Sequence, residues 1–389
     1  MIYEEAKEIQ DQLVTWRRAL HQMPELGCKL PETTAYIAGE LEKMGISHQV
    51  YPEISCITAL IGNGPKCILL RSDTDGLPLT EKSGESFAST NGCAHACGHD
   101  LHAATLLGAA KLLKKHEKEL NATVKLLFQP GEETFEGAQA AIRAGVMKNP
   151  EVDAAFAMHV FAGMDLGSFY YGDVPMGAVY GFRITVKGKG GHGSQPENCI
   201  DPINAGVQIY LALQSLIARE TSPLQNASLT IGSFQAGAAA NAIPDTAVLM
   251  GTLRTFDSAT RAMLIQRISA ISEQTAAAYR CGFSLDVLSD VPSLTNDPAF
   301  SSKCFASLKK AGVLKELHKD LKVMGSEDFA FFSQKVPSCY LVAGAGVEDK
   351  ARRRGQHNPE IVFNEDALAQ NAAAYAQVAL DWGQAPFTN

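Results

Sequence analysis

One short stretch of the sequence, residues 91–102, holds an unusual number of side chains that could bind a metal ion. The stretch contains His95, Cys97, His99, Asp100 and His102. Thiolate sulfur and imidazole nitrogen are the ligands that zinc and related transition metals prefer in proteins. The same residue types also occur in cores and helix caps, and Asp100 suits the N-cap of a helix that begins at Leu101. The stretch therefore suggests a metal site, which requires further ligands elsewhere in the chain.

Three predicted strands in other parts of the chain also end in ionisable residues. These residues are Asp73 and Asp75 after strand 67–71, Glu132 and Glu133 after strand 124–128, and His159 in strand 154–160. In open α/β sheets, ligands bind at the carboxyl ends of the strands. Adjacent carboxylates repel each other unless a cation lies between them, so one could bind metal while the other acts as a base. This convergence favours the metal interpretation, and His357 on a later loop is a further potential ligand.

Hydrophobic periodicity predicts the helices and strands that must position these residues. We expect helices at 3–20, 31–44, 101–113, 138–147, 297–311 and 364–382, and strands at 57–61, 67–71, 124–128, 154–160 and 338–343. Asn296 directly precedes one of these helices and is a candidate N-cap. Buried strands that alternate with helices are typical of an α/β domain.

The pattern changes in the middle of the chain. A strand that begins at Phe182 is followed by a helix at 203–219, strands at 228–235 and 247–256, and a helix at 261–278. This βαββα order is typical of an α+β domain with an antiparallel sheet. We therefore expect a domain of residues 178–288, inserted into a catalytic domain of residues 1–177 and 289–389.

Composition excludes several classes of protein. The formal net charge is −8 with 46% hydrophobic residues, and the basic runs are short, so no nucleic-acid partner is expected. No stretch reaches the roughly 18 apolar residues of a membrane span, and no membrane partner is expected. The nine cysteines are scattered without a disulfide framework, which favours a reducing cytoplasm.

Eight motifs occur in a fixed order along nearly the whole chain. They are Arg71-Ser-Asp-Thr-Asp-Gly-Leu-Pro, His95-Ala-Cys-Gly-His-Asp-Leu-His, Gln129-Pro-Gly-Glu-Glu, Met158-His, Gly190-Gly-His-Gly-Ser, Asn241-Ala-Ile-Pro, Gly325-Ser-Glu-Asp-Phe and His357-Asn-Pro. In this order they resemble the dinuclear-metal aminoacylase and carboxypeptidase superfamily of exopeptidases. The resemblance is to its amidohydrolase branch, which includes hippurate hydrolase, N-acyl-amino-acid amidohydrolases and indole-acetyl-amino-acid hydrolases.

The resemblance implies a mixed-sheet, zinc-exopeptidase-like catalytic domain that holds two divalent metal ions. The implied ligands are Cys97, His99, Glu133, His159 and His357. Glu132 would be the general base, and Asp75 would orient a ligand without binding metal itself, whereas Asp73 is not expected to bind metal. Zinc, manganese, cobalt and nickel could all serve such a site.

The resemblance also implies that the inserted α+β domain is a lid and dimerisation module, in a homodimer or homotetramer. In relatives, the histidine that matches His192 reaches the partner's active site and stabilises the developing oxyanion. Asn241 and Arg254 resemble residues that bind the substrate's carboxylate, although Arg254 also suits a strand position on a sheet surface. The loop that contains Gly325 and Ser326 would contribute to the acyl pocket.

The resulting prediction is a metal-dependent amidohydrolase that releases an amino acid, or another small carboxylated amine, from an N-acyl conjugate. The nearest alternative is a dipeptidase or carboxypeptidase of the same superfamily. A binding or sensor protein would not need a base beside its metal, so Glu132 argues against that class. A redox role for Cys93 and Cys97 is disfavoured because their Cys-x3-Cys spacing differs from the redox Cys-x-x-Cys motif.

Overall fold

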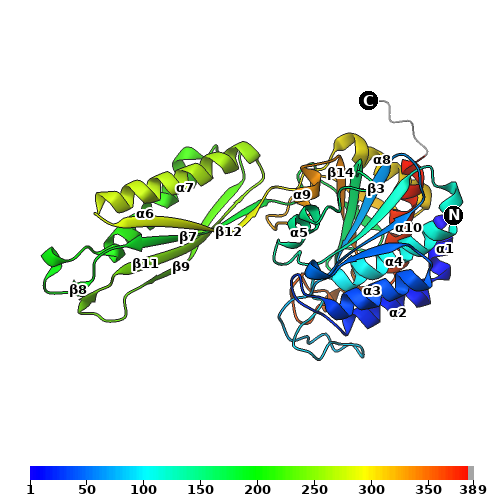
Figure 1. The fold of residues 1–389 in the computed structure, drawn as a ribbon, viewed down its shortest axis with the longest axis horizontal. Coiled ribbons are helices and arrows are strands. Elements are labelled where there is room, and N and C mark those ends of the chain that lie inside the picture. The colour runs from blue at the N-terminus through cyan, green and yellow to red at the C-terminus, as the bar shows by residue number, and fades with distance from the viewer. Residues whose placement is uncertain (384–389) are drawn as a thin grey trace. The chain divides into compact units, whose positions relative to one another are not determined.

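An eight-stranded mixed sheet forms the centre of the first of two units in the computed structural model, which describes residues 1–383 (Figure 1). The first unit comprises Met1–Pro175, Thr295–Leu321 and the chain from Asp328 onward. The second unit comprises Met176–Leu294 together with Lys322–Glu327. The predicted fold class, an α/β domain with a separate α+β domain, is confirmed.

The strands of the first sheet follow the order β1-β2-β4-β3-β5-β14-β6-β13. They are β1 (His48–Tyr51), β2 (Cys56–Ile61), β3 (Cys67–Asp73), β4 (Thr123–Gln129), β5 (Ala154–Phe161), β6 (Ser168–Tyr170), β13 (Glu316–His318) and β14 (Ser338–Gly344). The central strands β4, β3, β5 and β14 run parallel to one another, so their carboxyl ends meet at one edge of the sheet. Their residues are buried almost throughout, as expected for parallel strands that are covered on both faces.

Helices cover this sheet on both faces (Figure 1). They are α1 (Ile2–Glu8), α2 (Gln10–His21), α3 (Pro31–Lys43), α4 (His99–Lys115), α5 (Gly137–Arg143), α8 (Pro298–Ala311), α9 (Ala330–Ser333) and α10 (Ala367–Trp382). The helices α4 and α10 are buried over most of their length and pack against each other and against β3. Gly108 permits this approach, because a Cβ there would lie 2.5 Å from Leu13 Cδ2 and 3.0 Å from Ala372 Cβ.

Three local predictions about these helices are wrong. The helix predicted at 3–20 is divided at Ile9 into α1 and α2. Asp100 is not an N-cap, because α4 begins two residues earlier than expected, at His99, with Gly98 in the N-cap position. The cap of α8 is Asp297 rather than Asn296, since the Asp297 carboxylate accepts a hydrogen bond from the Phe300 N–H.

The second unit contains a four-stranded antiparallel sheet with the order β12-β7-β11-β9. Its elements are β7 (Ala178–Lys187), β8 (Gly191–His192), α6 (Pro202–Ser215), β9 (Ala227–Ala236), β10 (Ala242–Ile243), β11 (Thr246–Thr255), α7 (Ser258–Ala278) and β12 (Gly282–Val291). Both helices pack on one face of the sheet, where they enclose a separate hydrophobic core. The βαββα prediction missed β12, although the alternation of Phe283, Leu285 and Val287 indicates a strand.

A short antiparallel ribbon extends from this second sheet. It pairs β8 with β10, so that His192 lies opposite Ala242. No helix within residues 1–383 is long and apolar enough to cross a membrane.

Candidate metal centre and active site

The first unit brings the five predicted metal ligands together at the carboxyl edge of its sheet. Cys97 and His99 flank the start of α4, Glu133 follows β4, His159 lies near the end of β5, and His357 comes from the loop before α10. The Cys97 Sγ lies 3.2 Å from His159 Nε2. The Glu133 Oε1 lies 3.4 Å from His357 Nε2 and 3.9 Å from His99 Nε2. A small region therefore holds one thiol, three imidazoles and a carboxylate.

These donor atoms form two overlapping groups. In the first, atoms of Cys97, His99 and His159 lie within 4.8 Å of one another. In the second, Cys97 is grouped with Glu133 and His357 within the same distance. Cys97 belongs to both groups, and the two groups together would provide ligands for two neighbouring ions.

Hydrogen bonds fix the tautomers of two of these histidines. The Nδ1 of His99 lies 2.9 Å from the backbone oxygen of Asp75, and the Nδ1 of His159 lies 2.9 Å from that of Val160. A carbonyl oxygen can only accept, so each Nδ1 carries the proton and each Nε2 is left with a free lone pair. This is the arrangement that a metal-ligating histidine requires.

The surroundings of these lone pairs fit a bound metal. The His159 Nε2 accepts the thiol proton of Cys97, which a metal ion would replace. The His99 Nε2 is buried and has no hydrogen-bond partner among residues 1–383. A buried polar atom without a partner is rare and costly unless something else satisfies it. The donor set therefore fits divalent transition-metal ions.

The pKa values of these side chains also bear on metal binding. Burial raises the pKa of the Cys97 thiol and lowers the pKa of His159 well below its usual value. Cys97 and Glu133 together raise the pKa of His357 to about 10. Without an ion, protons therefore occupy the thiol and His357 at neutral pH. Metal binding must displace them, so the affinity for metal should fall at low pH.

Asp75 holds the paired acids and one histidine in place. Its Oδ1 accepts the backbone N–H of Glu132 and its Oδ2 accepts that of Glu133, both at 3.1 Å. Its backbone oxygen accepts from His99, as described above. These contacts suit the orienting role predicted for Asp75. Its carboxylate holds the backbone of Glu132 and Glu133, and its backbone oxygen holds the ring of His99.

Glu132, the predicted base, lies beside the ligands. An oxygen of its carboxylate lies within 4.8 Å of a ring nitrogen of His99 and of a carboxylate oxygen of Glu133, and its side chain is largely buried. The turn that leads to it requires a glycine at 131, where φ is +64° and a Cβ would lie 2.5 Å from Cys28 Sγ. The tight turn therefore brings both acids back over the end of β4.

Asp73 is engaged by other residues of the first unit. Its Oδ2 accepts from Arg71 Nη1 at 2.8 Å, and its Oδ1 accepts from His102 Nδ1 at 2.5 Å. The Asp73 Oδ2 lies 3.6 Å from His99 Nε2, which is outside hydrogen-bond distance. His102 was noted in the sequence as a possible metal-binding side chain, but no role was predicted for it. Its partners, Asp73 on β3 and Val160 on β5, lie far from it in the sequence.

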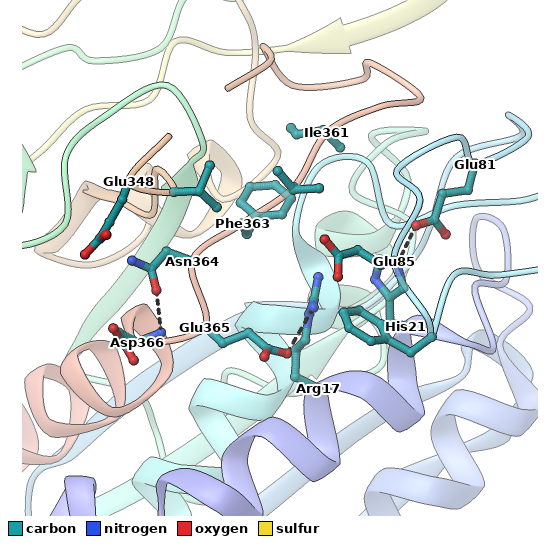
Figure 2. Close-up of a pocket in the computed structure, with 13 residues that line it drawn as sticks. Arg17, His21, Glu81, Glu85, Glu348, Ile361, Phe363, Asn364, Glu365 and Asp366 are labelled. Carbon is teal, nitrogen blue, oxygen red and sulfur yellow. Dashed lines mark hydrogen bonds and ion pairs between the residues drawn. The ribbon is translucent and has the colours of Figure 1, made fainter. Parts of the chain in front are cut away.

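An ion-pair network anchors the start of α4. Asp100 accepts from Arg17 Nε at 2.7 Å and from His21 Nδ1 at 2.8 Å, and His21 Nε2 lies 3.0 Å from Glu81. Arg17 and His21 line a pocket of about 400 Å³ in which most charged groups are already paired (Figure 2). Among residues 1–383, none of the five predicted ligands lines this pocket. Its charges therefore position α4 rather than form the metal centre.

In the second unit, the structure places His192 beside Asn241. The backbone oxygen of Asn241 accepts the N–H of Gly193 at 2.8 Å. The backbone N–H of Ser194 donates to His192 Nδ1, so the proton of the neutral ring lies on Nε2. The exposed His192 ring can therefore donate a hydrogen bond through Nε2.

The other predicted substrate residues lie together at the far end of β11. Arg254 Nη1 donates to Ser326 Oγ at 2.7 Å, Ser326 donates to the Gly177 oxygen, and the Gly325 oxygen accepts the Gly177 N–H. Arg254 is therefore not only a residue on the surface of β11, because its guanidinium also hydrogen-bonds the loop that contains Ser326.

Asn241 and Arg254, which are both predicted to bind the substrate's carboxylate, lie far apart within one chain. The ribbon with Asn241 joins β11 at Thr246, whereas Arg254 lies near the last residue of β11. Eight extended residues separate Thr246 from Arg254 and span about 26 Å. One chain cannot bring both side chains to the same carboxylate.

Residues 69–381 match the sequence model of peptidase family M20/M25/M40. It is 36% identical over 377 residues to IAA-amino acid hydrolase ILR1-like 4 of Arabidopsis thaliana, covering 95% of this chain and 85% of that protein. It is 36% identical over 381 residues to N-acetylcysteine deacetylase of Bacillus subtilis (strain 168), covering 96% of this chain and 97% of that protein.

The fold is similar to that of a solved relative. The crystal structure of the YXEP protein of Bacillus subtilis, described as a dinuclear metal binding peptidase from the M20 family, superposes with a TM-score of 0.83. The two chains are 32% identical, and the match covers 97% of this chain and 99% of the other. The family resemblance expected from the motifs is thus confirmed: the chain belongs to peptidase family M20/M25/M40, in its amidohydrolase branch.

Proposed function

We propose that this protein hydrolyses the amide bond of N-acyl amino acids, or of similar amides that carry a carboxylate, with two divalent metal ions. The observation that carries this proposal is the position of Glu132 beside a cluster of five donor side chains. A binding protein would need the ligands but not the adjacent carboxylate. Two relatives whose names denote amide-cleaving enzymes support the same reaction class.

When bound, the metal ions would polarise the amide carbonyl and make a water molecule more acidic. Glu132 would take the proton of the attacking water and pass it to the departing amine. Burial of Glu132 suits this role, because a proton acceptor shielded from bulk solvent delivers its proton to the nearby leaving group. Asp75 would keep Glu132 and Glu133 in their separate orientations through their backbone N–H groups.

The second unit would supply groups that recognise the rest of the substrate. His192, with its proton on Nε2, could donate to the oxygen on which negative charge develops. Arg254, presented by Ser326, could bind the carboxylate of the amino acid. Asn241 would act with His192, because Asn241 directly precedes β10, which pairs with the strand β8 that contains His192.

We further propose that two copies of the chain complete each active site. His192 and Arg254 lie near opposite ends of β11 in one chain, so a single chain cannot present both to one small substrate. The strand β9 is an unpaired edge of its sheet, and the neighbouring helix α6 exposes Ile203, Val207, Tyr210 and Leu211. An exposed edge with nearby apolar side chains favours pairing with a second copy. The second unit would then act as lid and dimerisation module, and a tetramer would need a further contact.

The reducing cytoplasm remains the compartment that we propose, because all nine cysteines are free thiols in the structure. The nearest alternative function is a dipeptidase or carboxypeptidase, which the word peptidase in the family and in one relative's title supports. The two functions differ in whether the acyl side of the substrate carries a charged α-amine. The metal cluster is equally suited to both.

A substrate panel separates these functions. Purified protein, loaded in turn with zinc, manganese, cobalt or nickel, would be offered N-acetyl, N-benzoyl and indole-acetyl amino acids and the matching free dipeptides. We expect release of the amino acid from the acyl conjugates and much slower cleavage of dipeptides. Cleavage of dipeptides alone would support the peptidase, and turnover of neither class by fully loaded protein would contradict both.

A further inference from the structure

The backbone of Val160 connects several parts of the metal centre. Val160 follows the ligand His159 in β5 and is buried. Its N–H donates to His102 Nε2 at 2.9 Å. Its carbonyl oxygen accepts from His159 Nδ1 at 2.9 Å and from Gln356 Nε2 at 2.7 Å. Side chains from α4 and from the loop of His357 therefore hold the same residue.

The contacts of His102 define its state. A backbone N–H can only donate, so His102 Nε2 uses its lone pair to accept the Val160 N–H, and the ring proton lies on Nδ1. That proton is donated to Asp73, which Arg71 holds from the other side. The ring is 3% exposed and stacks on His99, with 5.4 Å between the ring centroids.

This arrangement argues against His102 as a ligand. Its atoms do lie within 4.8 Å of atoms of Asp73 and His99, a distance at which three side chains could share an ion. However, both of its nitrogens already have partners, whereas the Nε2 of His99 has none within residues 1–383. His102 would have to break a buried hydrogen bond to bind metal.

Gln356 supports a ligand whose backbone is under strain. The next residue, His357, has φ +66°, a left-handed conformation that non-glycine residues adopt at a cost. Two contacts oppose this cost: the His357 N–H donates to the Ala96 oxygen at 2.9 Å, and Gln356 donates to Val160. Ala96 lies directly before Cys97, and Val160 lies directly after His159. The two contacts therefore hold the loop of His357 against both of these residues.

We propose that His102 and Gln356 are positioning residues, which hold the Val160 backbone from two sides and thereby fix His159 and His357 relative to Cys97. The proposal rests on the metal centre proposed above but not on any substrate. Partners of metal ligands commonly set affinity, and their loss costs about 10- to 100-fold. This role predicts that a replacement of His102 or Gln356 preserves metal affinity if the new side chain can still hydrogen-bond the backbone of Val160.

Cobalt binding to the metal-free protein tests this rule without any hydrolysis assay. His102→Gln offers a side-chain oxygen that can accept the Val160 N–H, whereas His102→Leu cannot. Gln356→Met matches the length of glutamine without a donor. His48→Leu and Gln139→Met, on β1 and α5, are the matched controls. The measurements are cobalt affinity by competition with a chelator, ions bound per chain, and the thiolate–cobalt absorption of Cys97.

We expect His102→Leu and Gln356→Met each to lower cobalt affinity by about 10- to 100-fold and to alter the absorption band. The control variants should match the unsubstituted protein, and His102→Gln should lie within a few-fold of it. The proposal is overturned if Gln356→Met and His102→Leu bind cobalt as the unsubstituted protein does. It is also overturned if His102→Gln loses one whole ion, because His102 would then be a ligand itself.

Thermal unfolding of each metal-free variant shows whether it folds. If His102→Leu does not fold, His102→Gln and Gln356→Met still decide the outcome. Failure of the amidohydrolase proposal would appear as absent turnover by protein that binds cobalt normally, a result that leaves the positioning role intact.

Discussion

Glu132 and Glu133 are neighbours in sequence, but their carboxylates have different surroundings. Glu133 faces His99 and His357, which makes it a metal ligand in our account. Glu132 is grouped with His99 and Glu133 but belongs to neither group that contains Cys97. The shared anchor Asp75 holds both backbones, so the difference arises from the directions of the side chains.

Glu132→Gln should therefore remove the proton acceptor and leave the ligands in place. Loss of a general base typically lowers the rate by about 10²- to 10⁴-fold, so kcat should fall by that factor. The metal content of the variant should equal that of the unsubstituted protein. The measurement is steady-state hydrolysis of an N-acyl amino acid, paired with metal analysis. A variant with normal kcat would show that Glu132 is not the base.

At this scale, the sequence was informative where chemistry follows an apolar strand. Glu133 and His159 could be predicted as ligands because the carboxyl ends of parallel strands share one edge. The contact between His102 and Val160 could not be predicted, because it joins a side chain to a backbone N–H that lies 58 residues away. The contact of Gln356 could not be predicted either, because its acceptor is the backbone carbonyl of Val160, which every residue type carries.

At the scale of elements, Gly98 joins Cys97 and His99, the two proposed ligands at the start of α4. Its φ is +92°, and a Cβ there would lie 2.7 Å from Val160 Cγ2 and 3.1 Å from Phe363 Cζ. Helix α4 can begin at His99 only if this position tolerates both the left-handed backbone and the close packing. The sequence suggested a start at Leu101, because the apolar run begins there and glycine leaves no side-chain cap to recognise.

Gly98→Ala should destabilise the metal-free protein by more than the left-handed conformation alone costs. Gly92→Ala is the matched control, because its φ is +83° and nothing lies within 4 Å of the added Cβ. The control should cost about 1–2 kcal/mol of unfolding free energy. Gly98→Ala should cost at least about 1 kcal/mol more, because a contact at 2.7 Å forces Val160 to move. Equal costs in urea unfolding would show that packing at Gly98 is unimportant.

The anchor of α4 should make stability depend on pH. Burial disfavours the charged form of His21, but Asp100 and Glu81 outweigh it and raise the pKa of His21 to about 9 from 6.5. Because the folded-state pKa is the higher one, the stabilisation is fully present below about pH 6.5 and is lost as the pH rises through 9. Its ceiling is about 3 kcal/mol, from 1.36 kcal/mol for each unit of pKa.

His21→Gln should therefore destabilise the metal-free protein more at pH 6 than at pH 10, as measured by urea unfolding at both values. Glu81→Gln removes one partner of His21 and should shift the loss of stability to lower pH. A cost of His21→Gln that is the same at pH 6 and pH 10 would mean that the ring is uncharged in the network.

At the scale of the whole molecule, the buried central strands and most of the long helices could be predicted, whereas the short strands β1, β6 and β13 and the separation of Asn241 from Arg254 could not. Periodicity identifies β11 as a strand but does not show that Asn241 precedes one end of it while Arg254 lies near the other. The fourth strand, β12, was missed because its alternation begins directly after a long helix and one of its faces is largely exposed. Pairing of distant strands is a tertiary property, which local patterns do not encode.

Mixing two inactive variants tests whether two chains complete each site. Glu132→Gln lacks the base, and His192→Ala lacks the proposed oxyanion donor. If His192 acts across a dimer, random exchange of equal amounts should restore about one quarter of the sites. A mixture of Glu132→Gln with Cys97→Ala is the control, because neither chain then has an intact metal centre with its base. No recovery despite demonstrated subunit exchange would show that His192 acts within its own chain.

A dinuclear active centre is tested by a metal titration of the metal-free protein, with hydrolysis of an N-acyl amino acid followed at each step. A dinuclear centre predicts that activity rises to a maximum at about two ions per chain. Cys97→Ala should bind fewer ions and remain inactive, because its sulfur belongs to both ligand groups. Full turnover by protein stripped of metal, or saturation of activity by Cys97→Ala at the same two ions, would contradict a dinuclear active centre that depends on Cys97.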